Sequence, residues 1–265
     1  MMMMMNVTNV SLSNQSSRQN NPLLPANIRG LIVGKGNCGK TVLLLNLLLK
    51  DDWLDYNNLL VFGNSLHQPE YRVIEEGFKK GLGKSQILSI FENQHMFTTN
   101  ISPLELIESY TDSKDGGIKG NFYGNCQLIP DPKSLDVSLK NLLILDDCFL
   151  GKQSKAEAYY TRGRHNNCDT LYISQNYFAL PRQSIRENSN FIILFPQNTK
   201  SVEHIYRDHC TDISYDEFKQ FCEIVWSTKH NFITIDLTST PLYGKYRKNL
   251  NTIYVPKKFL IKEQE

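Results

Sequence analysis

The amino-acid sequence predicts an α/β protein with a doubly wound, mainly parallel β-sheet that is flanked by helices. Apolar segments of strand length alternate with segments of helical spacing between residues 28 and 237. The segment Gly34–Thr41 matches the pattern G-x-x-x-x-G-K-[ST] and lies between an apolar strand and an apolar helix. A later apolar segment, Asn141–Asp146, ends in an acidic pair. Strands that alternate with helices form parallel sheets, which bind ligands at the carboxyl ends of their strands.

The composition is compatible with one large α/β domain, alone or with a small extension. Of the 265 residues, 40% are hydrophobic and 21% are charged, and the formal net charge is +2. This charge is too small to indicate a nucleic-acid partner by itself. No apolar run reaches transmembrane length, and the N-terminus lacks the basic and apolar regions of a signal peptide.

The six cysteines contain no C-x-x-C pair. One of them, Cys38, lies inside the G-x-x-x-x-G-K-[ST] segment, where a disulfide would be disruptive. We therefore expect reduced thiols in an intracellular protein. The cysteines are Cys38, Cys126, Cys148, Cys168, Cys210 and Cys222.

The chain up to residue 110 is expected to hold an arm followed by alternating strands and helices. Residues 6–21 are rich in Asn, Ser and Gln, which predicts a disordered or loosely attached segment. Pro69 and Pro103 stand in the first turn of expected helices, where proline is tolerated. The expected elements are a strand at 30–33, a helix at 42–49, a strand at 58–63, a helix at 69–80, a strand at 87–91 and a helix at 102–110.

The rest of the chain is expected to continue this alternation after an irregular stretch. Residues 112–132 contain Gly116, Gly117, Gly120 and Gly124, and they are expected to form a surface loop or insertion. The later expected elements are a strand at 141–146, a helix at 156–163, a strand at 170–174, a short helix at 181–188, a strand at 191–195, helices at 201–209 and 215–228, and a strand at 232–237.

The loop between the first strand and the first helix has residue types that bind phosphate groups. Gly34, Gly36 and Gly39 allow tight turns that bring backbone N–H groups close to a phosphate, and the helix start adds further donors. Lys40 is expected to contact the β- and γ-phosphates of ATP, and the Thr41 hydroxyl to hold Mg²⁺. The alternative, a glycine loop without a ligand, is disfavoured by the flanking strand and helix. The expected nucleotide-binding residues are Gly34, Lys35, Gly36, Asn37, Cys38, Gly39, Lys40 and Thr41.

Acidic and amide side chains follow two later strands. We expect Asp146 to hold Mg²⁺ through its water shell and Asp147 to orient or deprotonate an attacking water. Gln175, after the strand at 170–174, is expected to contact both the γ-phosphate and that water. The alternatives are a helix cap or loop start for the two acids and an ordinary loop position for the glutamine. Asp147 and Gln175 together favour ATP hydrolysis over passive nucleotide binding.

Four arginines flank the strand that precedes Gln175, and any of them could be ordinary surface charge. A transferring phosphoryl group needs additional positive charge, which a neighbouring subunit often supplies. We rank Arg164 first and Arg186 second as this arginine finger, ahead of Arg162 and Arg182.

With these segments in order, the chain resembles the FtsK/HerA-like superfamily of P-loop ATPases between Ile28 and Tyr254. Within it, the chain is similar to the viral DNA-packaging ATPases of the poxvirus, Polinton and virophage type. The run from GRH through SQ to IREN is more specific than the phosphate loop, which many NTPases share. The segments that carry the resemblance are GKGNCGKT (34–41), SLHQPEY (65–71), NLLILDDC (141–148), GRHNNCDTLYISQNYFALPRQSIRENSNFIILF (163–195), and FITIDLTS with YRKN within 232–249.

The resemblance implies a P-loop NTPase fold of the ASCE, RecA-like class and an ATPase that pushes double-stranded DNA into a preformed capsid. It further implies a homo-oligomeric ring of five or six subunits, an arginine finger that acts on the neighbour's nucleotide, and a capsid or portal protein as a partner. We expect a disordered arm at 1–26, a P-loop ATPase domain at 27–240 and a basic extension at 241–265. We expect no membrane partner, and the location would be a viral factory in the host cytoplasm or the nucleus.

Two other functions are consistent with parts of the same pattern. A nucleotide-dependent switch that binds a capsid or replication partner would need neither a trans arginine nor a DNA-facing surface. A small-molecule kinase would need a lid with clustered arginines, and the acidic pair with Gln175 suits water better as the acceptor. DNA contact has modest support from the C-terminal region, where six basic residues with interleaved tyrosines follow Asp236 before the next acid, Glu263. That region could equally be a solvated edge strand and tail.

Overall fold

The computed structural model describes residues 20–92, 103–109, 117–148 and 153–260. Most of the expected N-terminal arm, residues 1–19, therefore lies outside the described residues. The first half of the chain forms β1 (Arg29–Val33), α1 (Lys40–Leu49), β2 (Asn58–Gly63), α2 (Pro69–Lys79), α3 (Lys84–Glu92), α4 (Pro103–Ser109) and β3 (Lys119–Tyr123). The second half forms β4 (Asn141–Asp146), α5 (Ser154–Arg162), β5 (Cys168–Ser174), β6 (Phe191–Leu194), α6 (Thr199–His209), α7 (Tyr215–Trp226), β7 (Ile233–Asp236), β8 (Tyr246–Lys248), β9 (Thr252–Tyr254) and α8 (Lys257–Leu260).

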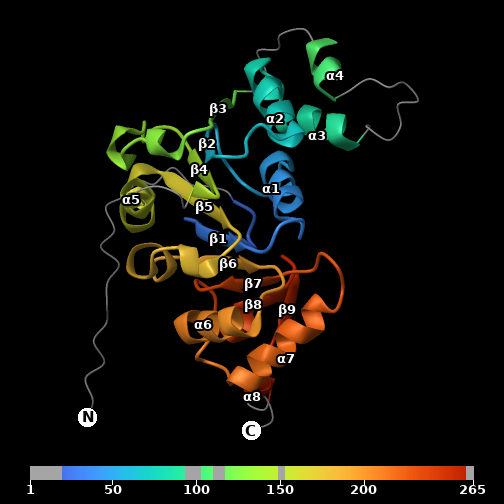
Figure 1. The fold of residues 1–265 in the computed structure, drawn as a ribbon, viewed down its shortest axis with the longest axis vertical. Helices are drawn as coiled ribbons and strands as arrows, with labels where there is room; N and C mark the ends of the chain where they lie inside the picture. The colour runs from blue at the N-terminus through green and yellow to red at the C-terminus, as the bar shows by residue number, and fades with distance from the viewer. Residues whose placement is uncertain (1–19, 93–102, 110–116, 149–152, 261–265) are drawn as a thin grey trace, which may run out of the picture.

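A single nine-stranded sheet organises the described part of the chain, with the strand order β3-β2-β4-β5-β1-β6-β7-β8-β9 (Figure 1). The strands from β3 to β6 are parallel to one another, and β7, β8 and β9 each pair antiparallel with the preceding strand of this order. The predicted doubly wound, mainly parallel sheet is confirmed. β5 lies between β1, which leads into the glycine loop, and β4, which ends in the acidic pair.

Helices cover both faces of the sheet, because alternate residues of each strand point to opposite faces. In β1, Ile32 packs into the core beneath α1, α2 and α3, whereas Leu31 and Val33 pack into the core beneath α5, α6 and α7. In Figure 1, α1 and α5 accordingly lie on opposite sides of the sheet. The continuous apolar strands of the sequence therefore reflect burial on both faces, as parallel sheets require.

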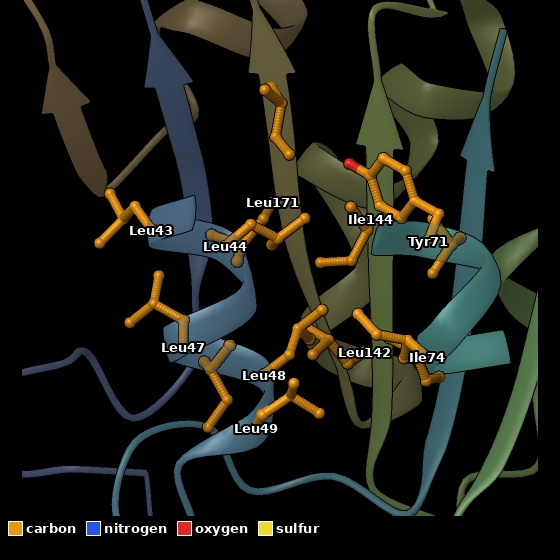
Figure 2. Close-up of a cluster of buried hydrophobic side chains, with 14 of the residues drawn as sticks. Leu43, Leu44, Leu47, Leu48, Leu49, Tyr71, Ile74, Leu142, Ile144 and Leu171 are labelled. Carbon is orange, nitrogen blue, oxygen red and sulfur yellow. The ribbon is translucent and has the colours of Figure 1, made fainter. Parts of the chain in front are cut away.

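The first helix is apolar because one side of it lies against the centre of the sheet. Leu44, Leu48 and Leu49 of α1 are fully buried. Figure 2 shows the leucines of α1 next to Leu171 of β5 and side chains of β4, with α2 covering the neighbouring part of the same face. The dense packing under α1 fixes where the glycine loop enters the helix. Ile74 of α2 belongs to this core as well.

Two expected elements before β4 were wrong. Residues 87–91, predicted as a strand, belong to α3, in which Ile87 and Ile90 are buried at helical spacing. The expected loop at 112–132 contains the strand β3, which pairs with β2 at the edge of the sheet. A side chain in place of Gly120 would lie 2.8 Å from Phe78 of α2, so the strand passes closely beneath that helix. β3 escaped the sequence analysis because it is polar and only half-buried.

The C-terminal region continues the sheet through β8 and β9. Arg247 of β8 is 2% exposed, forms an ion pair of 3.1 Å with Asp236 and donates a hydrogen bond to the backbone carbonyl of Leu23. Arg247 is therefore a buried structural residue rather than a surface contact for a DNA backbone. At the other end, Asn20 donates a hydrogen bond to Asp169 at the start of β5, so residues from 20 onward are attached to the domain.

The expectation of six reduced thiols was wrong for two residues. Cys126 and Cys148 form a disulfide with their Cα atoms 5.6 Å apart. Cys38, Cys168, Cys210 and Cys222 are free. Sequence spacing does not reveal such a pair, because β3 had to be recognised before Cys126 could be placed beside the end of β4.

Within the described ranges, no helix has both the length and the apolar character that crossing a membrane would require.

Candidate nucleotide-binding site

The carboxyl ends of β1, β4 and β5 meet at one edge of the sheet. The register pairs Val33 of β1 with Ser174 of β5, and Asp146 of β4 with Ile173 of β5. The glycine loop, the acidic pair and Gln175 follow directly after these residues, so the three predicted parts of the site are neighbours. Gln175 lies between the glycine loop and the acidic pair because β5 lies between β1 and β4 in the sheet.

The glycine loop is held in a conformation that requires glycine at two points. A Cβ at Gly34 would lie 2.5 Å from Sγ of Cys38 and 2.7 Å from Cβ of Phe195. Gly39 precedes α1 with a φ of 110°, which L side chains rarely adopt. Gly39 has no side chain that could cap α1, so the first N–H groups of the helix remain available to a ligand.

The ammonium group of Lys40 lies against the backbone of the glycine loop, where a phosphate would bind. Nζ of Lys40 donates hydrogen bonds to the carbonyl oxygens of Gly34 at 2.6 Å and Lys35 at 2.9 Å. An ammonium group at this position can exchange backbone carbonyls for phosphate oxygens through a side-chain rotation. Thr41 follows directly and lines the same cavity.

Asp146 is anchored by a side chain from α2. The hydroxyl of Tyr71 donates a hydrogen bond of 2.7 Å to Oδ2 of Asp146, and the Tyr71 ring is buried. Burial raises the pKa of Asp146 above that of an exposed carboxyl, while the Tyr71 hydrogen bond and the charge of Lys40 oppose this rise. Asp146 also lines the cavity described below, so its carboxylate is available to a cation there.

Asp147 and Gln175 are paired directly. Oδ2 of Asp147 accepts a hydrogen bond of 2.8 Å from Nε2 of Gln175, and Oδ1 accepts one of 3.2 Å from the Gln175 backbone N–H. The Asp147 backbone has a φ of 50°, in the left-handed region. A water bound to the Asp147 carboxylate would therefore lie within reach of the Gln175 amide.

These side chains surround a cavity of about 920 Å³. Its lining combines ionisable groups with apolar side chains, as nucleotide sites do. Lys40, Thr41, Asp146, Asp147 and Gln175 all line it, so the residues predicted to handle phosphate, Mg²⁺ and water are brought together. An uncapped helix start, an ammonium group and two carboxylates fit the donor and acceptor needs of a nucleotide with Mg²⁺.

Several lining residues were missed by the sequence analysis. Ser65 and Gln68 come from the segment before α2 and Glu70 from its first turn, within the stretch that the resemblance marked without assigning roles. His230 precedes β7, and its Nδ1 lies 3.3 Å from the carbonyl oxygen of Cys38 in the glycine loop. No local pattern signals His230, because the antiparallel pairing of β7 brings it to this edge. Phe195 and Phe232 are two further lining residues that were missed, with ring centroids 5.2 Å apart.

The arginines are not part of this cavity. Arg164 is exposed in a short helical turn directly before β5, at the amino end of that strand, whereas Gln175 follows its carboxyl end. The seven residues of β5 separate the two ends by about 20 Å, at roughly 3.3 Å per residue. Arg186 is 8% exposed, forms an ion pair of 3.2 Å with Asp208 and lies 4.8 Å from the centre of the Tyr177 ring.

The strand order, the glycine loop between β1 and α1 and the cavity at this edge define the fold of the P-loop NTPases. Comparison of the sequence with protein-family models and with curated proteins gives no match. Among solved structures, the chain is similar to the genome packaging NTPase B204 from Sulfolobus turreted icosahedral virus 2 in complex with AMPPCP. The TM-score is 0.48 at 12% identity, over 85% of this chain and 98% of that one.

Two further similar structures have comparable scores. The DNA-packaging ATPase B204 from Sulfolobus turreted icosahedral virus has a TM-score of 0.47 at 14% identity, over 85% of this chain and 97% of that chain. VirB4 of Thermoanaerobacter pseudethanolicus has a TM-score of 0.46 at 12% identity, over 94% of this chain and 93% of that chain.

Proposed function

We propose that this chain is an ATPase that moves double-stranded DNA and packages a viral or virus-like genome into a capsid. The observation that carries the ATPase proposal is the convergence of Lys40, Thr41, Asp146, Asp147 and Gln175 on one cavity. The DNA-packaging part rests on the sequence resemblance, and a capsid or portal protein would be a partner. Such a protein would act in an intracellular viral factory, in the cytoplasm or the nucleus.

The chain's own residues divide the work of hydrolysis. Lys40 and the loop N–H groups would bind the phosphates, and Thr41 and Asp146 would hold Mg²⁺. Bound Mg²⁺ would neutralise charge on the β- and γ-phosphates. Asp147 would accept a proton from, or orient, the attacking water, and the Gln175 amide beside it would keep that water in place.

The position of Arg164 supports an assembly of several copies. Because Arg164 lies at the amino end of β5, it is too far away to assist hydrolysis in its own chain. An exposed arginine at that end would serve as a finger only for the nucleotide of another copy, as a ring of five or six subunits would provide. Arg186 is a weaker candidate, because its guanidinium is buried against Asp208.

DNA contact is proposed for the exposed basic residues near the C-terminus. Lys248, Lys257 and Lys258 are exposed, whereas Lys245 is paired with Asp212 at 2.8 Å. Several subunits of a ring would multiply these few contacts with the phosphate backbone.

The test is steady-state ATP hydrolysis by the purified protein, with and without double-stranded DNA. We compare the wild type with Asp147→Asn and Arg164→Ala, and we use Arg207→Ala as the control because Arg207 is an exposed arginine paired with Glu203. DNA should stimulate the wild type and the control. Both site variants should be inactive alone, and a mixture of the two should regain activity, since each supplies what the other lacks.

Two results would contradict parts of this proposal. Turnover that is indifferent to DNA would favour a nucleotide-dependent switch over a translocase. An Arg164→Ala protein with normal activity would remove Arg164 from the site and with it the structural argument for shared sites.

A further inference from the structure

We propose that Cys126 and Cys148 form a thiol–disulfide exchange site that controls the position of Asp147. This inference rests on the proposed function, because it assumes that Asp147 acts on the attacking water. Cys148 follows Asp147 directly in the chain, and Cys126 lies in the short helical turn Cys126–Leu128 after β3. The co-substrate would be a small thiol or its disulfide, of the glutathione class.

The disulfide attaches the turn at Asp147 and Cys148 to the turn that follows β3 at the edge of the sheet. β3 is the edge strand and β2 separates it from β4, so the bond spans the end of β2. In the core cluster against which both cysteines pack, the rings of Phe62 of β2 and Tyr123 of β3 are stacked with their centroids 4.8 Å apart. The covalent bond therefore fixes the backbone after Asp147 to a packed edge of the sheet.

The remaining attachments of this turn are hydrogen bonds. The backbone N–H of Asp147 donates to the carbonyl oxygen of Ile173 at 3.0 Å, and the Asp147 side chain accepts from Gln175. The carbonyl oxygen of Cys148 accepts a hydrogen bond of 2.7 Å from Gln153. Asp147 is also in a left-handed conformation, which a non-glycine residue keeps only while its surroundings hold it there.

The two sulfurs differ in access, and this difference sets the order of exchange. Cys126 is partly exposed in a turn whose neighbour Leu128 is 59% exposed, whereas Cys148 is 3% exposed. An incoming thiolate attacks the Cys126 sulfur, the S–S bond breaks, and the Cys148 sulfur leaves and takes up a proton. A second thiolate attacks the mixed disulfide and releases the Cys126 thiol, so one disulfide and two small thiols become two protein thiols and one small disulfide.

The reduced state is accommodated by the same packing. Sγ of Cys148 lies 3.3 Å from the carbonyl oxygen of Phe62, so a thiol at this position has an acceptor despite its burial. Three of the free cysteines, Cys168, Cys210 and Cys222, are buried and are therefore poor competitors for exchange. Burial raises the pKa of Cys210 to about 12 and also raises the pKa values of Cys222 and Cys38, which lowers the thiolate fraction of these residues.

The experiment equilibrates the full-length protein in buffers of varied ratio of reduced to oxidised glutathione. Alkylation and mass spectrometry measure the fraction of the Cys126–Cys148 bond, and ATP hydrolysis is measured on the same samples. Reduction should lower kcat about tenfold, a part of the ~10²- to 10⁴-fold effect of a positioned base, and leave KM for ATP nearly unchanged. Cys126→Ser should match the reduced wild type in every buffer, and Cys222→Ala should keep the redox response.

A second readout separates this inference from the proposed function. Hydrogen exchange at the Asp147 amide should be faster in the reduced protein and in Cys126→Ser, whether or not the protein hydrolyses ATP. Equal exchange in the oxidised and reduced forms overturns the inference, as does a kcat that is unchanged after the bond is cleaved. A protein that shows the exchange difference but no hydrolysis in either state keeps the disulfide site and rejects the ATPase.

Discussion

The hydroxyl of Tyr71 and the carboxylate of Asp146 are joined by a hydrogen bond of 2.7 Å. This bond connects α2 to the carboxyl end of β4, at the point where the predicted Mg²⁺ ligand enters the cavity. It also stabilises the ionised form of Asp146, which burial destabilises. The residue that holds Mg²⁺ in our proposal is thus oriented by a helix that the glycine-loop pattern does not include. In Figure 2, Tyr71 stands beside Ile144 of β4, on the same face of the sheet as α1.

Removing this hydroxyl should alter the pH dependence of hydrolysis. Metal binding needs the Asp146 carboxylate, so activity should fall as the pH drops through its pKa. Burial raises that pKa, and in Tyr71→Phe the loss of the hydrogen bond should raise it further. The acid limb of the pH–rate profile should therefore move to higher pH, and the Mg²⁺ requirement should increase.

Tyr243→Phe is the control for this measurement, because Tyr243 is 79% exposed. Its profile should overlie that of the wild type. An acid limb in Tyr71→Phe at the wild-type position would show that the hydrogen bond does not tune Asp146.

The same buried carboxyl should limit the stability of the fold at neutral pH. The pKa of Asp146 is higher in the folded state than in the unfolded chain, so the folded state favours the protonated carboxyl. The resulting contribution to stability is fully present below the pKa that Asp146 has in the unfolded chain. That contribution is lost as the pH rises through the folded-state pKa. We expect Asp146→Asn, which keeps an acceptor for Tyr71, to have a higher Tm than the wild type at pH 7 and to lack ATPase activity.

Thermal unfolding at several pH values checks this expectation. The difference in Tm should shrink toward acidic pH, where the wild-type carboxyl is protonated. Asp52→Asn, at an exposed position, should show no comparable gain at pH 7. A lower Tm for Asp146→Asn at pH 7 would mean that the ionised carboxylate stabilises the fold.

Much of the fold could be predicted because its signals are local. The apolar strands around Leu31, Leu143 and Tyr172 are buried on both faces, so each is a continuous apolar run that ends at a turn. The glycine loop and the acidic pair were recognisable because their chemistry depends on residues that are adjacent in sequence. Their meeting at one cavity followed from the parallel order of the strands.

The parts that escaped prediction depend on contacts between distant segments. Tyr71 reaches Asp146 and His230 reaches the glycine loop through tertiary packing, and each sits in a segment whose pattern resembles an ordinary helix or loop. The strand β3 is polar and pairs only at the sheet edge, so it resembles a loop. The apolar run Ile87–Phe91 is too short for its period to separate helix from strand.

The first position of the glycine loop should tolerate no side chain. In Gly34→Ala the new Cβ would meet Cys38 and Phe195 at under 3 Å, and Phe195 is buried against the sheet. We expect a loss of about 1–3 kcal/mol of unfolding free energy, typical of overpacking, together with the loss of nucleotide binding. Chemical denaturation and titration with a fluorescent ATP analogue measure the two effects.

Gly36→Ala provides the matched comparison for stability. No heavy atom of the described chain lies within 4 Å of a Cβ at this position. Its unfolding free energy should stay within about 0.5 kcal/mol of the wild type, as for surface substitutions. Equal stability losses for the two glycines would mean that the contacts of Gly34 are relieved by a loop movement.

The two arginine candidates should separate into a functional and a structural residue. Arg164 is exposed, so Arg164→Ala should leave the unfolding free energy nearly unchanged and lower kcat by about 10³-fold or more, the effect of losing a finger arginine. Arg186→Ala leaves Asp208 buried, at 6% side-chain exposure, and without its closest cationic partner. This variant should lose about 3–5 kcal/mol of stability, as expected when one partner of a buried ion pair is removed.

Measuring urea denaturation and ATP hydrolysis on both variants distinguishes the roles. Adding Asp208→Asn to Arg186→Ala should recover part of the lost stability, because the uncompensated charge is removed. If the Arg186→Ala protein is as stable as the wild type yet inactive, the finger is Arg186 and the ion pair must open when subunits meet. Activity that is restored by mixing Arg164→Ala with Asp147→Asn, and not by mixing Arg186→Ala with Asp147→Asn, places the shared arginine at the start of β5.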